Sequence, residues 1–238
     1  YRVAAAVAPF RALALSASAS SGARLPSILE LFGDRVFIQE SPGLRPERSR
    51  SYDVGVVLSG DTGELCGQLE ARGFLLNIDD LIVYRQTSQF RFEAENVDSA
   101  RILGLELGAQ TAYGRHLALS GSLTALDTQN QFGKALPLRP PLTFSARPEL
   151  SLFPSFLDRA SIYADVEHIS FVYLDPANLS VLDGRTIFSL GASVRFAQRM
   201  TLSARARNLF DVQATDVLSR PLPRFGFFVS LAAEEALN

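Results

Sequence analysis

The side chains best placed to do chemistry are seven charged residues that fall at alternate positions within four segments of the chain. Residues at alternate positions of a β-strand point to the same face, so each set would project from one side of a strand. Guanidinium and carboxylate groups mixed on one surface hold a polar partner through charge-assisted hydrogen bonds. In a soluble β-sandwich the same charges would simply form the face exposed to water. The residues are Arg147, Glu149, Asp165, Glu167, Arg195, Arg205 and Arg207.

Residues of the kinds that catalyse reactions or bind metals are few and scattered. The chain has two histidines, His116 and His168, and one cysteine, Cys66. A metal site would need further ligands from other segments, and neither a Gly-x-Ser-x-Gly motif nor a glycine-rich phosphate loop occurs. The sequence therefore predicts no enzyme, no cofactor and no metal ion. A net charge of −2 gives no electrostatic support for binding nucleic acid, which requires a basic stripe or patch.

The elements that must position the charges are strands in which apolar and polar residues alternate. In Thr186–Phe196, for example, Phe188 and Leu190 share one face while Ser189 and Arg195 share the other. Period-two alternation predicts a strand with one apolar and one polar face. Eleven such strands are expected, one of which contains a Ser-Ala run that resembles a linker: Val3–Ala8, Leu13–Ser20, Tyr52–Leu58, Leu65–Leu75, Leu103–Thr111, Leu117–Ala125, Leu142–Leu152, Ala160–Ile169, Thr186–Phe196, Met200–Asn208 and Phe225–Ala232.

The connections between these strands alternate between short and long. Short turns on one rim and long loops on the other are typical of bacterial outer-membrane barrels, and strands of about 9–11 residues suit a tilted crossing of the bilayer. No run of about 20 apolar residues occurs, which excludes a helical membrane protein. The long loops are expected at Gly22–Arg48, Asp79–Glu95, Leu126–Pro140, Ser170–Arg185 and Leu209–Arg224.

The sequence therefore predicts an all-β fold, an antiparallel transmembrane β-barrel, as a single domain over residues 1–238. Its apolar face would contact outer-membrane lipid, and the seven charges would line the lumen. Tryptophan is absent, so an aromatic girdle must come from the 17 Phe and 6 Tyr. Bacterial single-chain barrels have an even number of strands. We therefore expect further strands to pair with Val3–Ala8 and Phe225–Ala232, and the sheet of this chain to remain open.

Six short motifs resemble landmarks of TonB-dependent receptor barrels. Each is weak alone, but their shared order over nearly the whole chain is specific. They are Ser18–Ser27 followed by Glu30-Leu31-Phe32-Gly33, Pro42–Ser49 followed by Tyr52–Gly55, Asn77–Ile82, Asn96-Val97 followed by Gly104-Leu105-Glu106, Asn208–Asp211, and Pro223-Arg224-Phe225.

The resemblance implies the C-terminal half of a 22-stranded barrel in the outer membrane of a Gram-negative bacterium, with its long loops outside the cell. It also implies partners: the remaining strands, a plug domain outside this chain, and a TonB complex that acts through that plug. The implied function is energised uptake of a scarce solute, such as the metal chelate of an iron-siderophore. The alternative is a barrel fragment that serves as a passive pore wall or structural scaffold.

The first long loop is expected to contribute ligand contacts. Four arginines in this loop would either attract an anionic ligand or form a solvated charge cluster, and the second reading is favoured. They are Arg24, Arg35, Arg45 and Arg48.

Overall fold

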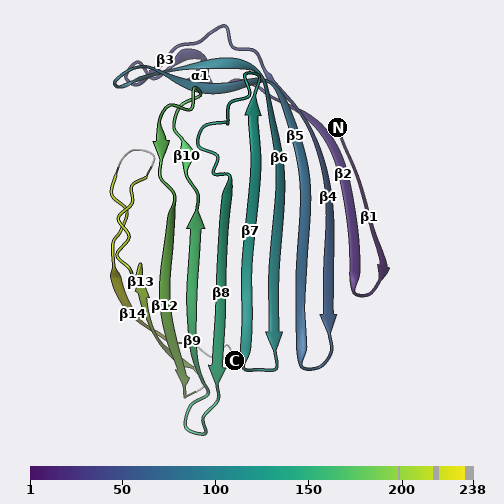
Figure 1. The fold of residues 1–238 in the computed structure, drawn as a ribbon, viewed down its shortest axis with the longest axis vertical. Helices are drawn as coiled ribbons and strands as arrows, with labels where there is room; N and C mark the ends of the chain where they lie inside the picture. The colour runs from purple at the N-terminus through teal and green to yellow at the C-terminus, as the bar shows by residue number, and fades with distance from the viewer. Residues whose placement is uncertain (198, 217–219, 234–238) are drawn as a thin grey trace.

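Eleven antiparallel strands, hydrogen-bonded in chain order, form almost the whole molecule (Figure 1). The structure is a computed structural model, and it describes residues 1–197, 199–216 and 220–233. The strands are β1 (Arg2–Phe10), β2 (Leu13–Arg24), β4 (Glu47–Asp61), β5 (Leu65–Ser88), β6 (Arg91–Tyr113), β7 (Leu117–Asn130), β8 (Leu142–Leu152), β9 (Arg159–Ile169), β12 (Arg185–Phe196), β13 (Met200–Arg207) and β14 (Gly226–Ala233).

Small elements occupy the long loops at one end of the sheet. The helix α1 (Ile28–Phe32) and the two-residue strand β3 (Ile38–Gln39) lie between β2 and β4, and β3 pairs in parallel with β6. The short strands β10 (Val172–Tyr173) and β11 (Val181–Leu182) pair with each other between β9 and β12. Among the described residues, no helix has the length and apolar character needed to cross a membrane.

Each of the eleven strands predicted from the sequence corresponds to one strand of this sheet, and the Ser-Ala run lies within β2. One prediction about the connections is wrong. Asp79–Glu95 is not a loop, because β5 and β6 continue through it as a ladder that pairs Leu81 with Val97 and Arg85 with Glu93. The two strands turn back on each other only at the tip of this hairpin.

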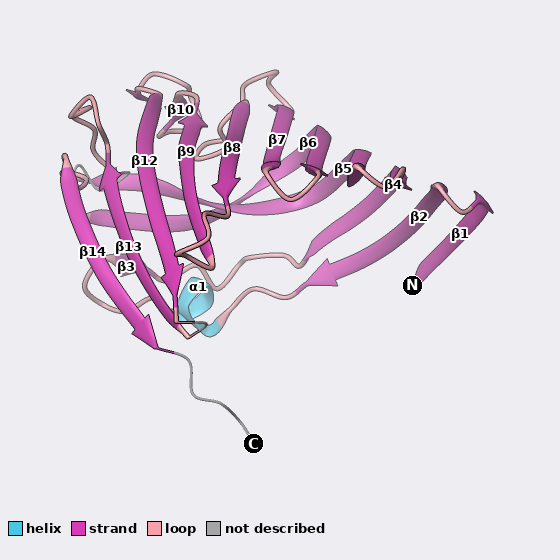
Figure 2. Ribbon diagram, turned by 90° about the horizontal axis from the view of Figure 1, so that it is seen from below, coloured by secondary structure: helices cyan, strands magenta, loops and turns pink. Residues whose placement is uncertain are grey.

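The sheet is an open trough rather than a closed ring (Figure 2). β1 and β14 lie at its two edges, and neither has a second neighbour among the described residues. The expected open sheet is therefore confirmed. At the long-loop end, α1 and the upper part of the β5–β6 hairpin lie across the mouth of the trough (Figures 1 and 2).

The two faces of the trough differ in chemistry. Arg24 bonds to Glu30 of α1 across the concave side, and the residues that share its face on β2 include Ser18 and Ser20. On β12, Ser189 of the concave face is 2% exposed, whereas Leu190 of the convex face is 46% exposed. The alternation read from the sequence thus places polar residues inside the trough and apolar residues outside.

The apolar part of the convex face has a definite height, and we call it the apolar band. On β5 it runs from Leu65 to Leu75, which spans about 33 Å of strand and, at a tilt of about 40°, a height of about 25 Å. That height matches the lipid-facing band of outer-membrane barrels. Tyrosines lie at both ends of the band, since Tyr113 is opposite Leu65 and Tyr52 is opposite Leu75.

Above the apolar band the two faces of β5 and β6 exchange their polarity. Leu76 and Ile102 point to the concave side, where Ile102 belongs to a buried cluster closed by Leu136 from the loop after β7. Asn77 and Arg101 point to the convex side. The adjacent Leu75 and Leu76 therefore mark the height at which the apolar face changes sides.

Candidate functional site

The inner wall of the trough carries a cluster of ion pairs on β8, β9 and β13. Asp165 accepts hydrogen bonds from Arg147 Nε at 2.5 Å and from Arg205 Nη2 at 3.0 Å. Glu167 Oε1 lies 3.8 Å from the same Arg205 nitrogen. The guanidinium of Arg147 also stacks over the ring of Tyr163, 4.7 Å from its centroid.

A second inner pair lies nearer the short-turn end, where Arg159 Nη2 donates to Glu149 Oε1 at 2.5 Å and to Ser151 at 2.9 Å. Sequence reasoning missed Arg159, although it falls at the period-two position before Ser161. The register places Arg195 opposite Arg159 and Arg207 opposite Gly226. The structure therefore places all seven predicted charges on the concave face. Ion pairs on this face join Arg147 to Asp165, Arg205 to Asp165 and Glu167, and Glu149 to Arg159.

The inner wall also contains polar atoms without partners. Within the described part of the chain, Ser189 Oγ and Arg205 Nε are buried and make no hydrogen bond. A buried polar atom without a partner costs about 1–3 kcal/mol. Both atoms are covered by other atoms of this chain, so the polar groups that the inner wall offers to another segment are half-exposed side chains such as Arg147 and Glu167.

A network that we call the rim hub ties the long loops to the upper end of the wall. Arg24 donates to both oxygens of Glu47, each at 2.7 Å, and to both oxygens of Glu30 at 3.1 Å. Ser27 and Glu30 form a capping box at the start of α1, which fixes the helix against this arginine. Glu47 also accepts from the backbone N–H of Ile82 at 2.8 Å, so the hub reaches the base of the β5–β6 hairpin.

The hub continues on the other side of that hairpin. Asn96 accepts from the backbone N–H of Arg45 at 2.8 Å and donates to the backbone carbonyls of Arg45 and Asp80. Arg45 and Asp80 form an ion pair at 2.7 Å. These residues come from four of the six motifs that resemble the receptor family. Motifs that are far apart in the sequence are therefore in contact in the structure.

The carboxylates of the hub are held in their charged form. Burial works against ionisation of both Glu30 and Glu47, but hydrogen bonds outweigh it. Donors from Ser27 and Arg24 lower the pKa of Glu30 below its ordinary value. Donors from Arg24 and the Ile82 backbone do the same for the pKa of Glu47. The hub is therefore fully formed at neutral pH.

A further motif closes the loop before β14. Asn208 is 1% exposed with a left-handed φ of 55°, and its side chain accepts from Val212 N–H at 2.9 Å and donates to the Val212 carbonyl at 3.0 Å. Asp211 forms an ion pair with Arg224 and accepts from the Phe225 N–H at 3.1 Å. These contacts fix the entry into the last strand.

At the long-loop end, a hollow of about 490 Å³ lies between the first long loop and the hairpin tip. It is lined by Phe32, Arg35, Val36, Phe37, Glu40 and Arg91, among others. The structure thus divides the four predicted loop arginines. Arg35 lines the hollow, Arg24 and Arg45 serve the rim hub, and Arg48 lies on the convex side of β4. Sequence reasoning missed Arg91, because the pairing of β3 with β6 that brings it beside the first long loop cannot be read from a single sequence.

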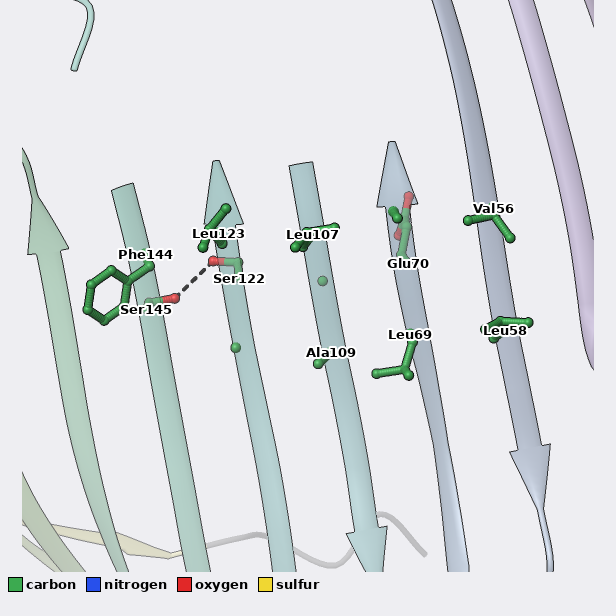
Figure 3. A pocket seen from close by; sticks show the side chains of 13 residues that line it. Val56, Leu58, Leu69, Glu70, Leu107, Ala109, Ser122, Leu123, Phe144 and Ser145 are labelled. Atoms are coloured by element: carbon green, nitrogen blue, oxygen red, sulfur yellow. Dashed lines mark hydrogen bonds between the residues drawn. The ribbon is translucent and has the colours of Figure 1, made fainter. Parts of the chain in front are cut away.

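The convex face is hollowed as well, but in a different way (Figure 3). A depression of about 480 Å³ lies within the apolar band, walled by Leu58, Leu69, Leu107, Leu123 and Phe144. Small residues such as Ala109 and Gly121 form its floor. Glu70, Ser122 and Ser145 belong to the opposite face at the same height. In the described residues, no group of three or more His, Cys, Asp or Glu side chains is arranged to hold a metal ion.

A curved antiparallel sheet with an apolar outer band, a charged inner face and long loops at one end defines the wall of a membrane β-barrel. The family described as "TonB dependent receptor-like, beta-barrel" matches residues 1–209. The chain belongs to the TonB-dependent receptor family and forms part of its barrel.

Named relatives support this assignment. The chain is 30% identical over 206 residues to the vitamin B12 transporter BtuB of Photobacterium profundum, and the match covers 84% of this chain and 32% of that protein. The structure of the copper transporter OprC is similar at a TM-score of 0.78, with 23% identity over 98% of this chain and 38% of that one. A ferric enterobactin receptor of Pseudomonas aeruginosa in complex with enterobactin gives a TM-score of 0.73 at 18% identity, over 97% and 40%.

The chain therefore spans about a third of the length of the vitamin B12 transporter that it matches. These relatives are transporters and receptors, and TonB-dependent receptors are outer-membrane proteins of Gram-negative bacteria.

Proposed function

We propose that this chain is the wall and part of the extracellular mouth of an outer-membrane receptor for energised uptake of a scarce, anionic solute, such as the metal chelate of a siderophore. The observation that carries the proposal is the hollow at the long-loop end. Two arginines, Arg35 and Arg91, reach it from separate segments that the β3–β6 pairing holds together.

The lining suits a chelate that carries negative charge on an organic framework. Phe32 and Phe37 offer exposed rings to the apolar part of such a ligand, and the two guanidinium groups offer donors to its anionic oxygens. Loops that a rigid scaffold positions are common sites of binding. The relatives named above are a vitamin B12 transporter, a copper transporter and a ferric enterobactin receptor, and this range is consistent with a variable loop pocket above a shared wall.

The inner wall would hold the plug domain that closes the barrel. The half-exposed side chains of Arg147 and Glu167 would bond to plug residues, and the Asp165 cluster would fix the register of that contact. A partner complex that pulls on the plug would then break a limited set of polar contacts and open a path along this wall. In this proposal the seven inner charges belong to the plug interface rather than to the solute.

Binding to the full-length receptor tests the proposal. Arg35→Ala combined with Arg91→Ala removes both cations of the hollow and leaves the rim hub intact. Hydrogen bonds to charged groups contribute about 1.5–3 kcal/mol each, so loss of both should lower affinity for the cognate chelate by at least about 100-fold. The probes are ferric complexes of a catecholate and of a hydroxamate siderophore, with cyanocobalamin as a third.

The matched control is Arg85→Ala, on the same hairpin. Its guanidinium pairs with Glu93 and Glu95 and does not line the hollow. The control should bind like the unchanged receptor. Equal affinity of the double variant and the control for every probe that binds would refute the assignment of the hollow.

A further inference from the structure

The convex face just above the apolar band carries a polar row that neither the solute nor the plug can reach. This row, which we call the outer arginine row, consists of Arg50 on β4, Asn77 on β5, Arg101 on β6 and Gln129 on β7. Cross-strand register makes them direct neighbours. It lies one convex-facing position above Tyr52, Leu75 and Leu103.

The row sits at the height where a membrane protein meets lipid headgroups. The exchange of polarity at Leu75 and Leu76 ends the apolar band, and Tyr52 occupies the boundary in the manner of an interfacial aromatic. A convex-facing side chain one row higher therefore faces the headgroups of the surrounding leaflet. Arginines at that height meet phosphate groups.

Two hollows meet at Tyr52 and together have the shape of an amphiphile. The upper one, of about 360 Å³, is lined by Arg50, Asn77, Arg101 and Gln129. The lower one, of about 610 Å³, is almost entirely apolar. Its floor consists of small residues such as Ala17, Ala19 and Gly73, and Tyr52 lines both hollows.

The positive charges of the outer arginine row are only partly neutralised by neighbouring carboxylates. Arg50 shares its guanidinium with Asp79 at 3.2 Å, in a pair of which both members are solvated. Within the described part of the chain, Arg101 and Arg48 have no ion-pair partner. Asp127, opposite Leu103, is a further acidic side chain on this face, one row below Arg101. Since strands are about 4.8 Å apart, Arg50 and Arg101 lie roughly 10 Å apart on either side of Asn77, within reach of one phosphate group.

The geometry points to a binding site for a phosphorylated acyl lipid of the leaflet that surrounds the long-loop end. Arg50 and Arg101 bind the phosphate, Asn77 and Gln129 donate to its oxygens or to the adjoining polar group, and an acyl chain lies in the apolar hollow below Tyr52. The charge and the continuous apolar slot favour this occupant over a partner protein, which would require an interface larger than these two hollows.

Native mass spectrometry of the full-length receptor in neutral detergent tests the site, with a short-chain phosphatidate as the probe. Each basic residue near a membrane surface contributes about fivefold to the binding of anionic lipid. Arg50→Ala combined with Arg101→Ala should therefore weaken phosphatidate binding by about 30-fold. Asp79→Asn should strengthen it, because Arg50 loses its competing partner. Arg139→Ala, an exposed cation in the loop after β7, is the matched control and should bind normally.

Two further ligands show whether the phosphate, the acyl chains or both are needed for binding. A diacylglycerol with the same chains lacks the phosphate, and inorganic phosphate lacks the chains, and both should bind much more weakly than phosphatidate. Equal binding of diacylglycerol, equal binding of inorganic phosphate, or unchanged phosphatidate binding by the double variant would each overturn the proposal. Retained heat-modifiable migration in gel electrophoresis shows that the variants are folded. Solute binding measured on the same samples separates this site from the proposed hollow.

Discussion

Arg24 is the residue whose loss should do most damage to the loops without unfolding the wall. Within the described part of the chain, its guanidinium is the one cation that pairs with both Glu30 and Glu47, whose side chains are 7% and 12% exposed. Arg24→Ala would leave two carboxylates close together with no cation. Breaking a buried pair costs about 3–5 kcal/mol. Arg24 itself is 47% exposed, so water compensates in part, and we expect a loss of about 2–3 kcal/mol.

This loss should be local to the long-loop end. Hydrogen exchange should show faster opening of α1 and of the Ile82 amide, and limited proteolysis should cut the loop between α1 and β4 sooner. Arg85→Ala breaks solvated pairs with Glu93 and Glu95, and it should cost at most about 1 kcal/mol. Adding Glu47→Gln to Arg24→Ala should restore part of the protection, because it removes the carboxylate repulsion. Equal protection of the loop in Arg24→Ala and Arg85→Ala would refute this account of the rim hub.

Three further outcomes follow from the structure. Folding lowers the pKa values of Glu30 and Glu47, so the stability that these two carboxylates contribute is complete above about pH 4.5 and is lost as pH falls through the lowered values. Protection of α1 from proteolysis should therefore decrease in that acidic range, and an increase there would contradict the lowered pKa values. Leu202→Arg on the convex face should destabilise the barrel by about 2–4 kcal/mol in lipid, and Ser203→Arg on the concave face by much less; folding titrations in vesicles measure both, and equal costs would show the faces to be misassigned. Asn208→Ala removes buried hydrogen bonds at a left-handed residue and should cost about 2–3 kcal/mol in the same assay, whereas a cost below about 0.5 kcal/mol would contradict this role.

The sequence predicted the strands well because the membrane imposes strict alternation within the apolar band. It failed beyond Leu75, because the three successive apolar residues Phe74, Leu75 and Leu76 broke that alternation. The physical reason is that β5 leaves the lipid there and packs its other face against Ala100, Ile102 and the loop residue Leu136. A prediction that expects the apolar residues to stay on one face ends the strand where they change faces. The outer half of the hairpin was therefore predicted to be a loop.

The candidate site was predictable only in part. Alternation placed Arg147 and Asp165 on one face, but their contact depends on the register between β8 and β9, which a single sequence does not contain. The same applies to Arg24, which sequence reasoning assigned to ligand binding as one of four loop arginines. Its actual contacts, Glu30 and Glu47, come from two other motifs. Charge type was readable from the sequence, and pairing was not.

The left-handed residue Asp80 is a point about which the outer half of the β5–β6 hairpin would rotate as one unit. Its φ of 58° interrupts the extended run of β5, and Arg45 and Asn96 clamp it at that point. The eight residues from Leu81 to Ser88 form an arm of about 26 Å beyond it. A rotation of about 10° at Asp80 would displace the tip of the hairpin, and Arg91 with it, by about 4–5 Å. Small changes in the contacts of Asp80 with Arg45 and Asn96 would therefore change the width of the opening at the long-loop end.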